Sequence, residues 1–219
     1  MSEFTNNAEQ RAEELANYMQ ELLQGENGLQ LIEKHALKTS KFIPHDIVGA
    51  FDILMDKQIS IEDLKFVSNK LFNILYQTIL EYPALTPAQG SILDIYTQDN
   101  AVALANLKDM REHIKAINKQ AEVVHVQALM QKLIAFEKFF LHYTVIENVV
   151  FPVLEAKWKH HQCVKLMWSF HDDIKRNVKR LVELLSAVEI DLKEFNSVCG
   201  LVFFNVNTII LREEKIIFP

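Results

Sequence analysis

The sequence predicts an all-α protein, and three observations lead to this fold class. Glycine and proline number only five each among 219 residues, which is few for a fold made of strands and tight turns. Apolar residues recur at helical spacing along most of the chain, and no segment alternates at period two for long enough to be a strand. Apolar residues make up 49% of the chain, so the helices have enough apolar surface to bury a core.

The N-terminal part is predicted to be a small helical domain. Pro44 suits the first turn of a helix, and Ser60 with Asp63 resembles a capping box. The expected helices cover about 7–24, 29–39, 44–55 and 60–82. The segment YPALTPAQG at 82–90 contains two prolines and a glycine and is the strongest break in the chain. We therefore expect an N-terminal helical domain over 1–85 and a second domain over 86–219.

The second domain is predicted to be an up-down-up-down four-helix bundle. Four long helical patterns follow the break, and only short turns separate them, so each helix is expected to pack antiparallel to the next. The expected helices cover about 90–119, 122–158, 160–188 and 191–217.

Composition argues against several functions. The formal charge of −6 disfavours nucleic acid and anionic membranes as partners. No apolar run approaches the about 20 residues of a membrane span, and the polar, acidic N-terminus is not a targeting signal. Cys163 and Cys199 are expected to be buried free thiols, which is typical of a cytoplasmic protein. Pro219 is compatible with a natural helix end or with a further domain beyond it.

Each long helix is expected to place one polar residue in its apolar stripe. These residues are Asn100, His142, His171 and Glu213. At about 1.5 Å rise per residue, antiparallel packing brings the first three to similar depths, with Glu213 nearer that end of the bundle. A buried carboxylate needs a proton, a cation or a metal. Two imidazoles and a carboxylate in one layer therefore suggest a metal site, and the alternative is a hydrogen-bonded core cluster.

Three segments resemble the hemerythrin-like, or HHE cation-binding, family. They are HYTVIENVVFP at 142–152, MWSFHDDI at 167–174 and REEKIIFP at 212–219. The N-terminal helices resemble a helical domain of unknown function that precedes the HHE bundle in one bacterial subgroup. Members of that subgroup often carry a C-terminal PAS domain.

The resemblance implies a ligand set of about five histidines and two bridging carboxylates around two irons, and this chain departs from it. His142, His171 and Glu213 keep their positions. Asn100, after Asp99, stands at the first-helix histidine position. Ile146 and Ile209 replace two further ligands, with Glu147 one step round the helix from Ile146. A normal di-iron centre is therefore not expected.

The sequence leaves three possibilities for what this pocket binds. The first is a single iron or zinc ion held by His142, His171 and Glu213, assisted by Glu147 or Asn100. The second is haem with His142 and His171 as axial ligands. The third is no cofactor.

The sequence thus favours a cytoplasmic sensory or regulatory protein that binds iron or haem. It would respond to a small ligand or gas at the metal and act on a protein partner or a further C-terminal domain. The alternatives are a metal-free protein-interaction module and a non-haem iron-handling protein or oxidoreductase. No motif for a phosphate loop, a catalytic triad or a zinc protease supports an enzyme.

Overall fold

The computed structural model describes residues 3–83 and 86–218, and all regular elements in these ranges are helical. The prediction of an all-α protein is confirmed. Neither range contains a strand. The helices begin and end within a few residues of the predicted bounds, with one shorter helix near the N-terminus and local changes of helix type near two Phe-Pro pairs.

The described residues form two compact units. The first comprises the described part of 1–85 together with 153–169 and 212–218, and the second comprises 86–152 and 170–211. Two segments from the predicted second domain thus group with the N-terminal helices. That 1–85 and 86–219 are separate domains stays a prediction.

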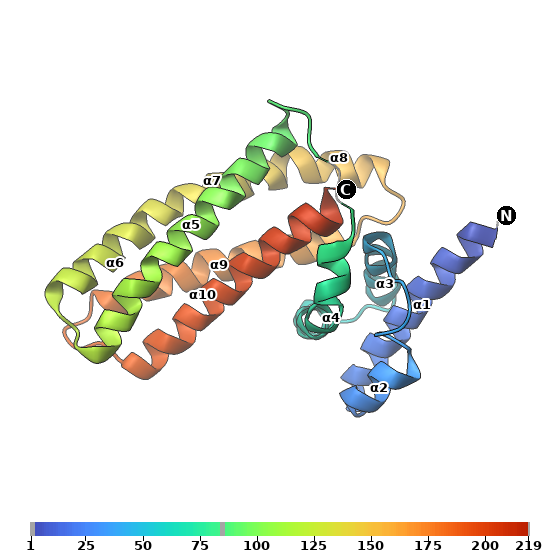
Figure 1. Ribbon diagram of the computed structural model, residues 1–219, viewed down its shortest axis with the longest axis horizontal. Helices are drawn as coiled ribbons and strands as arrows, with labels where there is room; N and C mark the ends of the chain where they lie inside the picture. Colours follow the sequence, from blue (N-terminus) through green and yellow to red (C-terminus); the bar gives the residue numbers. More distant parts are fainter. Residues whose placement is uncertain (1–2, 84–85, 219) are drawn as a thin grey trace. The chain divides into compact units, whose positions relative to one another are not determined.

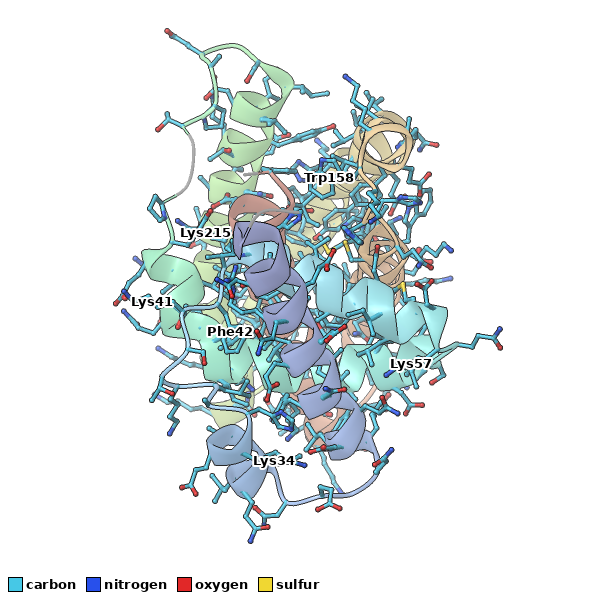
Figure 2. The ribbon with its side chains drawn as sticks, turned by 90° about the vertical axis from the view of Figure 1, so that its right-hand side faces the viewer. Lys34, Lys41, Phe42, Lys57, Trp158 and Lys215 are labelled. Atoms are coloured by element: carbon cyan, nitrogen blue, oxygen red, sulfur yellow. The ribbon has the colours of Figure 1, made fainter. Side chains whose placement is uncertain are left out.

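In the first unit, α1 (Glu3–Leu23) packs against α3 (Pro44–Asp56), and both also contact α4 (Ile61–Glu81). The close approach of α1 and α3 depends on Gly49, because a Cβ atom there would come within 3.1 Å of the Ala12 side chain. Leu15, Met19 and Leu54 are completely buried in this core. Figure 2 shows Phe42 among the helices, where it is buried, and the exposed Lys34 and Lys41 at the rim.

Local sequence signals set the helix ends of this unit. Pro44 begins α3, and the Ser60 hydroxyl accepts the Asp63 amide at the start of α4, as predicted. Helix α2 (Gly28–Lys34) is shorter than the predicted 29–39. It stops because Ala36 has a φ of +48°, in the left-handed region, which ends an α-helix.

Polar contacts attach the two later segments to the first unit. The buried Asp52 of α3 accepts the backbone amide of Gln162 at 2.9 Å and lies 3.1 Å from Nδ1 of His160. Arg212 donates to Ser68 and Asn69 of α4 at 3.1 and 2.8 Å, and its guanidinium lies over the Phe72 ring. These contacts explain why 153–169 and 212–218 group with the N-terminal helices.

The second unit contains long helices that follow one another along the chain, as Figure 1 shows. The elements that contribute to it are α5 (Ile92–Lys119), α6 (Val123–Phe136), the 3₁₀ turn η1 (Glu137–Phe139), α7 (Phe140–Val145), the π-helical turn η2 (Ile146–Val150), the start of α8 (Phe151–Lys157), most of α9 (Cys163–Leu185) and α10 (Leu192–Arg212).

Side-chain contacts show which of these helices are neighbours. Helix α5 packs against α6. Asn118 of α5 and Asn196 of α10 exchange two amide hydrogen bonds of 2.9 and 2.6 Å. Arg180 of α9 binds Glu194 of α10 through two nitrogens at 2.7 and 3.0 Å. The buried apolar residues of α9 lie where the helical period predicts, and Cys199 of α10 is a buried free thiol.

Two π-helical turns, η2 and η3 (Glu213–Ile217), each come directly before a Phe-Pro pair. In both turns the phenylalanine amide donates to the carbonyl five residues earlier: Phe151 to Ile146, and Phe218 to Glu213 at 2.9 Å. A proline ring would clash with the carbonyl four residues before it in a regular α-helix. The wider turn before Pro152 relieves this conflict in η2, and π turns are frequent at functional sites.

The turn η2 changes which side chains of this helix are buried, compared with a regular α-helix. The α-helical period places Val149 and Val153 in the core, but their exposed fractions are 48% and 50%. The extra residue in the π turn rotates the following helix, so Phe151 is buried instead, with 1% exposed. The helical period of the sequence alone does not predict this rotation of the helix.

Two helical stretches are long and apolar enough to cross a membrane by length and composition, namely Val123–Lys157 and Leu192–Ile217. The sequence prediction had found no such run. Core helices of soluble proteins meet the same criterion.

Candidate functional site

The second unit contains two buried histidines, each beside a carboxylate and each in contact with the ring of Tyr143. His171 of α9 is completely buried. Its Nδ1 lies 2.8 Å from Oε1 of Glu147 in η2. The imidazole is nearly parallel to the Tyr143 ring at a centroid distance of 4.1 Å and to the Phe151 ring at 6.0 Å. The hydrogen bond and the ring contacts fix both the position and the plane of this imidazole.

Glu147 lies in the π turn η2, five residues after His142 and directly after Ile146. The side chains of Ile146 and Glu147 are both buried, with 0% and 6% exposed. Lys175, one turn after His171 on α9, also reaches Glu147 at 3.3 Å. Burial raises the pKa of the Glu147 carboxyl, but the hydrogen bond from His171 and the charges of His171 and Lys175 outweigh it and leave the pKa below its ordinary value.

His142 of α7 has a similar environment. It is buried, with 4% exposed, and its Nδ1 lies 3.4 Å from Oδ2 of Asp99 on α5. Its ring stacks on Phe139 at 4.6 Å and meets Tyr96 edge to face at 4.7 Å. The adjacent Asn100 is buried as predicted. The side chain that faces His142 is nevertheless the carboxylate of Asp99.

A carboxylate at Nδ1 selects the tautomer of each ring. Nδ1 of His142 and of His171 is the donor to Asp99 and Glu147, so in the neutral ring the lone pair is on Nε2. Histidines that ligate metals are commonly held in this way, with one nitrogen on the metal and the other N–H on a carboxylate. The arrangement therefore suits metal or haem ligation through Nε2 as well as a closed hydrogen-bonded core cluster.

Glu213, the remaining predicted ligand, is completely buried at the start of η3. It belongs to the first unit, where η3 packs on α3 and α4. It is therefore not among the residues that the second unit brings together. Within 3–83 and 86–218, no three His, Cys, Asp or Glu side chains are grouped so that they could hold a metal ion.

Sequence reasoning passed over three residues of this site. Tyr143, next to His142, is completely buried and stacks on His171. Lys175 follows His171 by four residues, and this spacing on a helix is the signal that could have found it. Asp99 was noted only as the neighbour of Asn100.

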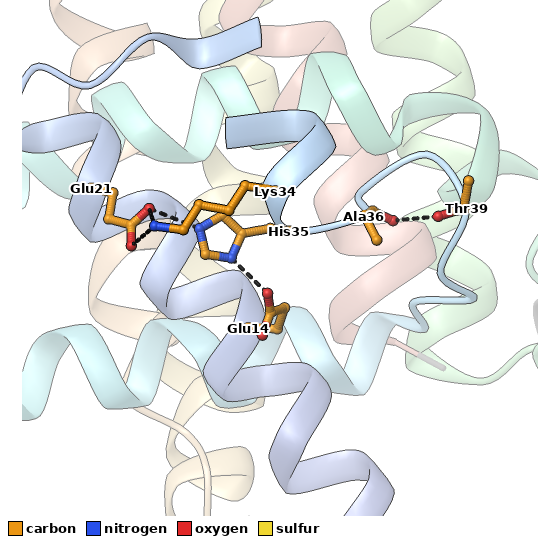
Figure 3. A network of polar contacts seen from close by, with 6 residues as sticks. All are labelled: Glu14, Glu21, Lys34, His35, Ala36 and Thr39. Carbon is orange, nitrogen blue, oxygen red and sulfur yellow. Dashed lines mark hydrogen bonds and ion pairs between the residues drawn. The ribbon is translucent and has the colours of Figure 1, made fainter. Parts of the chain in front are cut away.

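The first unit contains a histidine network of its own, drawn in Figure 3. His35 is buried, with 4% exposed. Its Nδ1 lies 2.7 Å from Glu14 and its Nε2 lies 2.9 Å from Glu21, which also accepts from Lys34 at 2.7 Å. A ring that faces a carboxylate at both nitrogens makes both hydrogen bonds only when it carries both protons. This histidine therefore holds α2 to α1.

A cavity of about 860 Å³ also lies in the first unit. Its lining combines apolar side chains from α1 and α3 with the aromatic Tyr82 and Trp158. None of the predicted ligands lines it.

Comparisons with protein-family models, with curated proteins and with solved structures find no match to this chain.

Proposed function

We propose that the long helices of the second unit form a hemerythrin-like, up-down-up-down four-helix bundle. The contacts of α5 with α6 and α10, of α9 with α10, and of His171 on α9 with Glu147 in η2 support this arrangement. In this proposal the Phe-Pro pairs and the π turns before them belong to the bundle, and η2 carries the buried Ile146 and the buried Glu147 side by side.

The bundle binds a single iron centre through Nε2 of His142 and of His171. The observation that carries this proposal is the shared environment of the two histidines: each is buried, stacked on an aromatic ring and held by a carboxylate at Nδ1. The carboxylates and the aromatic rings fix the tautomer and the orientation that a metal-ligating histidine needs.

The residues present do not fit a di-iron centre, because Asn100, Ile146 and Ile209 stand at ligand positions. They fit a centre that takes two imidazoles, either haem iron or one non-haem ion with iron or zinc chemistry. Asp99 and Glu147 are the carboxylates that hold the two imidazoles, whereas Glu213 belongs to the first unit. An iron ion would supply redox chemistry when bound, and a single non-haem ion would also leave a binding position for a small ligand or gas.

The protein acts as a cytoplasmic sensory or regulatory protein in this proposal. On a single non-haem ion, two ligating histidines would leave coordination positions for a signal molecule, whereas on haem a signal molecule would have to displace one of the two axial histidines. Occupancy or redox state would reach a partner protein or a further domain through the helices that carry His142 and His171.

Metal content and absorption spectra test the proposal. The full chain is purified, and iron, zinc and haem are quantified before and after reconstitution with iron(II) or haemin. The variants are His142→Ala and His171→Ala, and the control is His45→Ala, which removes an exposed histidine of the first unit. Circular dichroism verifies that each variant is folded.

Two results would support the proposal and would separate its two forms. A Soret band that is lost in His142→Ala or His171→Ala and kept in His45→Ala identifies haem. Stoichiometric iron or zinc without a Soret band, lost in the same two variants, identifies a single non-haem metal. Absence of both after reconstitution, or equal binding by all variants, overturns the proposal.

A metal-free interaction module is the second candidate, and one observation favours it. The helical stretch from α6 to η2 exposes six large apolar residues, with exposed fractions from 40% to 68%: Val123, Val124, Ile134, Leu141, Val145 and Val149. Exposed apolar patches often mark interaction sites. A Leu141→Lys variant that abolishes self-association or partner binding while the chain stays metal-free would favour this candidate.

A further inference from the structure

A pair of histidines away from His142 and His171 joins the end of α5 to the start of α6. His113 lies in the last part of α5 and His125 in the first turn of α6, and both are half-buried. Their Nδ1 atoms are 3.3 Å apart. The ring centroids are 5.6 Å apart, and the ring planes are inclined by 50°. Both residues belong to the second unit.

The distance between the two nitrogens suits a shared metal ion. Zinc binds histidine nitrogen at about 2.0–2.1 Å in tetrahedral geometry, which places two ligand nitrogens about 3.3 Å apart. The observed separation of 3.3 Å matches this value. Without a metal, one ring must donate its Nδ1–H to the other, so the two rings need different tautomers. A divalent cation satisfies both nitrogens at once.

The carboxylates close to the pair are already engaged by lysines. Asp109, one turn before His113, pairs with Lys132, and Glu112, its neighbour on α5, pairs with Lys115 at 2.8 Å. The two imidazoles are therefore the ligands that the protein offers at this point.

We propose that His113 and His125 form a two-histidine site for a late first-row divalent cation, best fitted by Zn²⁺, that clamps α5 to α6. Imidazole is a preferred ligand of zinc, copper and nickel. The described residues supply no third His, Cys, Asp or Glu to the group, so water takes the remaining coordination positions. The ion ties the two helices together beside the turn at 120–122.

This site is independent of the proposed iron or haem centre, and the experiment keeps the two apart. Metal-free full-length chain carrying His142→Gln and His171→Gln is titrated with ZnCl₂ by isothermal titration calorimetry. His113→Gln and His125→Gln are then added singly and together. His161→Gln, which removes a histidine of the first unit, is the matched control, and MgCl₂ is the control ion. Circular dichroism verifies the fold of each variant.

The background protein is expected to bind about one equivalent of Zn²⁺ and no Mg²⁺, and bound zinc is expected to raise its melting temperature. Each single glutamine variant should weaken binding at least about tenfold, the equivalent of about 1.4 kcal/mol, and the double variant should abolish it. The His161→Gln control should bind as the background does. Absence of zinc binding in the background, or an unchanged isotherm in the double variant, overturns the proposal.

If the His142→Gln and His171→Gln background does not fold, the same titration is made on the wild-type chain. The measure is then the loss of one zinc equivalent in His113→Gln/His125→Gln relative to wild type. If the double variant binds as many equivalents of zinc as the wild-type chain, the two-histidine site is refuted. Such a result leaves the iron or haem proposal unaffected.

Discussion

The imidazole of His171 and the carboxylate of Glu147 form a buried hydrogen bond of 2.8 Å, and Glu147 lies in the π turn η2. Glu147 and the preceding Ile146 are both buried, with 6% and 0% exposed. The buried carboxylate gives this histidine a charged partner. The same pair suits a metal ligand with its supporting carboxylate.

Replacing Glu147 by glutamine should destabilise the fold. Glutamine keeps an acceptor oxygen for His171 but removes the charge that also attracts Lys175. A hydrogen bond to a charged group contributes about 1.5–3 kcal/mol, so we expect Glu147→Gln to lower the free energy of unfolding by about 1–3 kcal/mol. Urea unfolding followed by circular dichroism measures this. Glu137→Gln, at an exposed position of the same helical stretch, should change it by less than about 0.5 kcal/mol.

Acid should weaken the same interaction. The folded-state pKa of Glu147 is lower than the ordinary value, so its contribution to stability is complete above the unfolded-state pKa, about 4.3. It is lost as the pH falls through the folded-state pKa. The stability difference between wild type and Glu147→Gln should be constant at about pH 6–7 and should shrink from about pH 5 downward. A difference that grows on acidification would contradict the sign of this shift.

Two substitutions, one within η2 and one directly after it, test the rotation of the helix. Phe151→Ala removes a ring with 1% exposed and should cost about 3–5 kcal/mol. Val149→Ala alters a side chain with 48% exposed and should cost less than about 1 kcal/mol. An uninterrupted α-helix predicts the reverse order, because it places Val149 in the core. The free energies of unfolding of the two variants, measured by thermal and urea unfolding, decide between a helix with this rotation and a helix without it.

The network around His35 should be a main support of the first unit. His35→Gln cannot donate to Glu14 and Glu21 in the geometry of a doubly protonated imidazole (Figure 3). We expect a loss of about 1.5–3 kcal/mol, seen as earlier unfolding of the N-terminal helices in hydrogen exchange. His45→Gln, at an exposed position of α3, serves as the control. Equal protection of the N-terminal helices from hydrogen exchange in the two variants would mean that the network adds little to the stability of the first unit.

Much of the local structure could be predicted from the sequence, because its causes are local. Helical spacing, Pro44 at a first turn and the Ser60 cap were sufficient for the all-α class and for most helix bounds. The same period placed His142 and His171 on buried positions, and it also predicted the burial of Glu213. These predictions succeed because side chains of an amphipathic helix reach the core at a fixed interval.

The partners of these residues were decided by the tertiary structure. Asp99 and His142 are 43 positions apart in the chain, and Glu147 and His171 are 24 apart, so no local pattern pairs them. A fixed helical period of 3.6 residues also does not predict the π turns, because the one added residue in each turn rotates every later side chain around the helix axis. The grouping of 153–169 and 212–218 with the N-terminal helices depends on contacts such as Asp52 with Gln162. The sequence by itself determined most of the buried side chains along each regular helix, with exceptions such as Leu104, which is 37% exposed. Only packing between distant segments determined what each buried polar group meets.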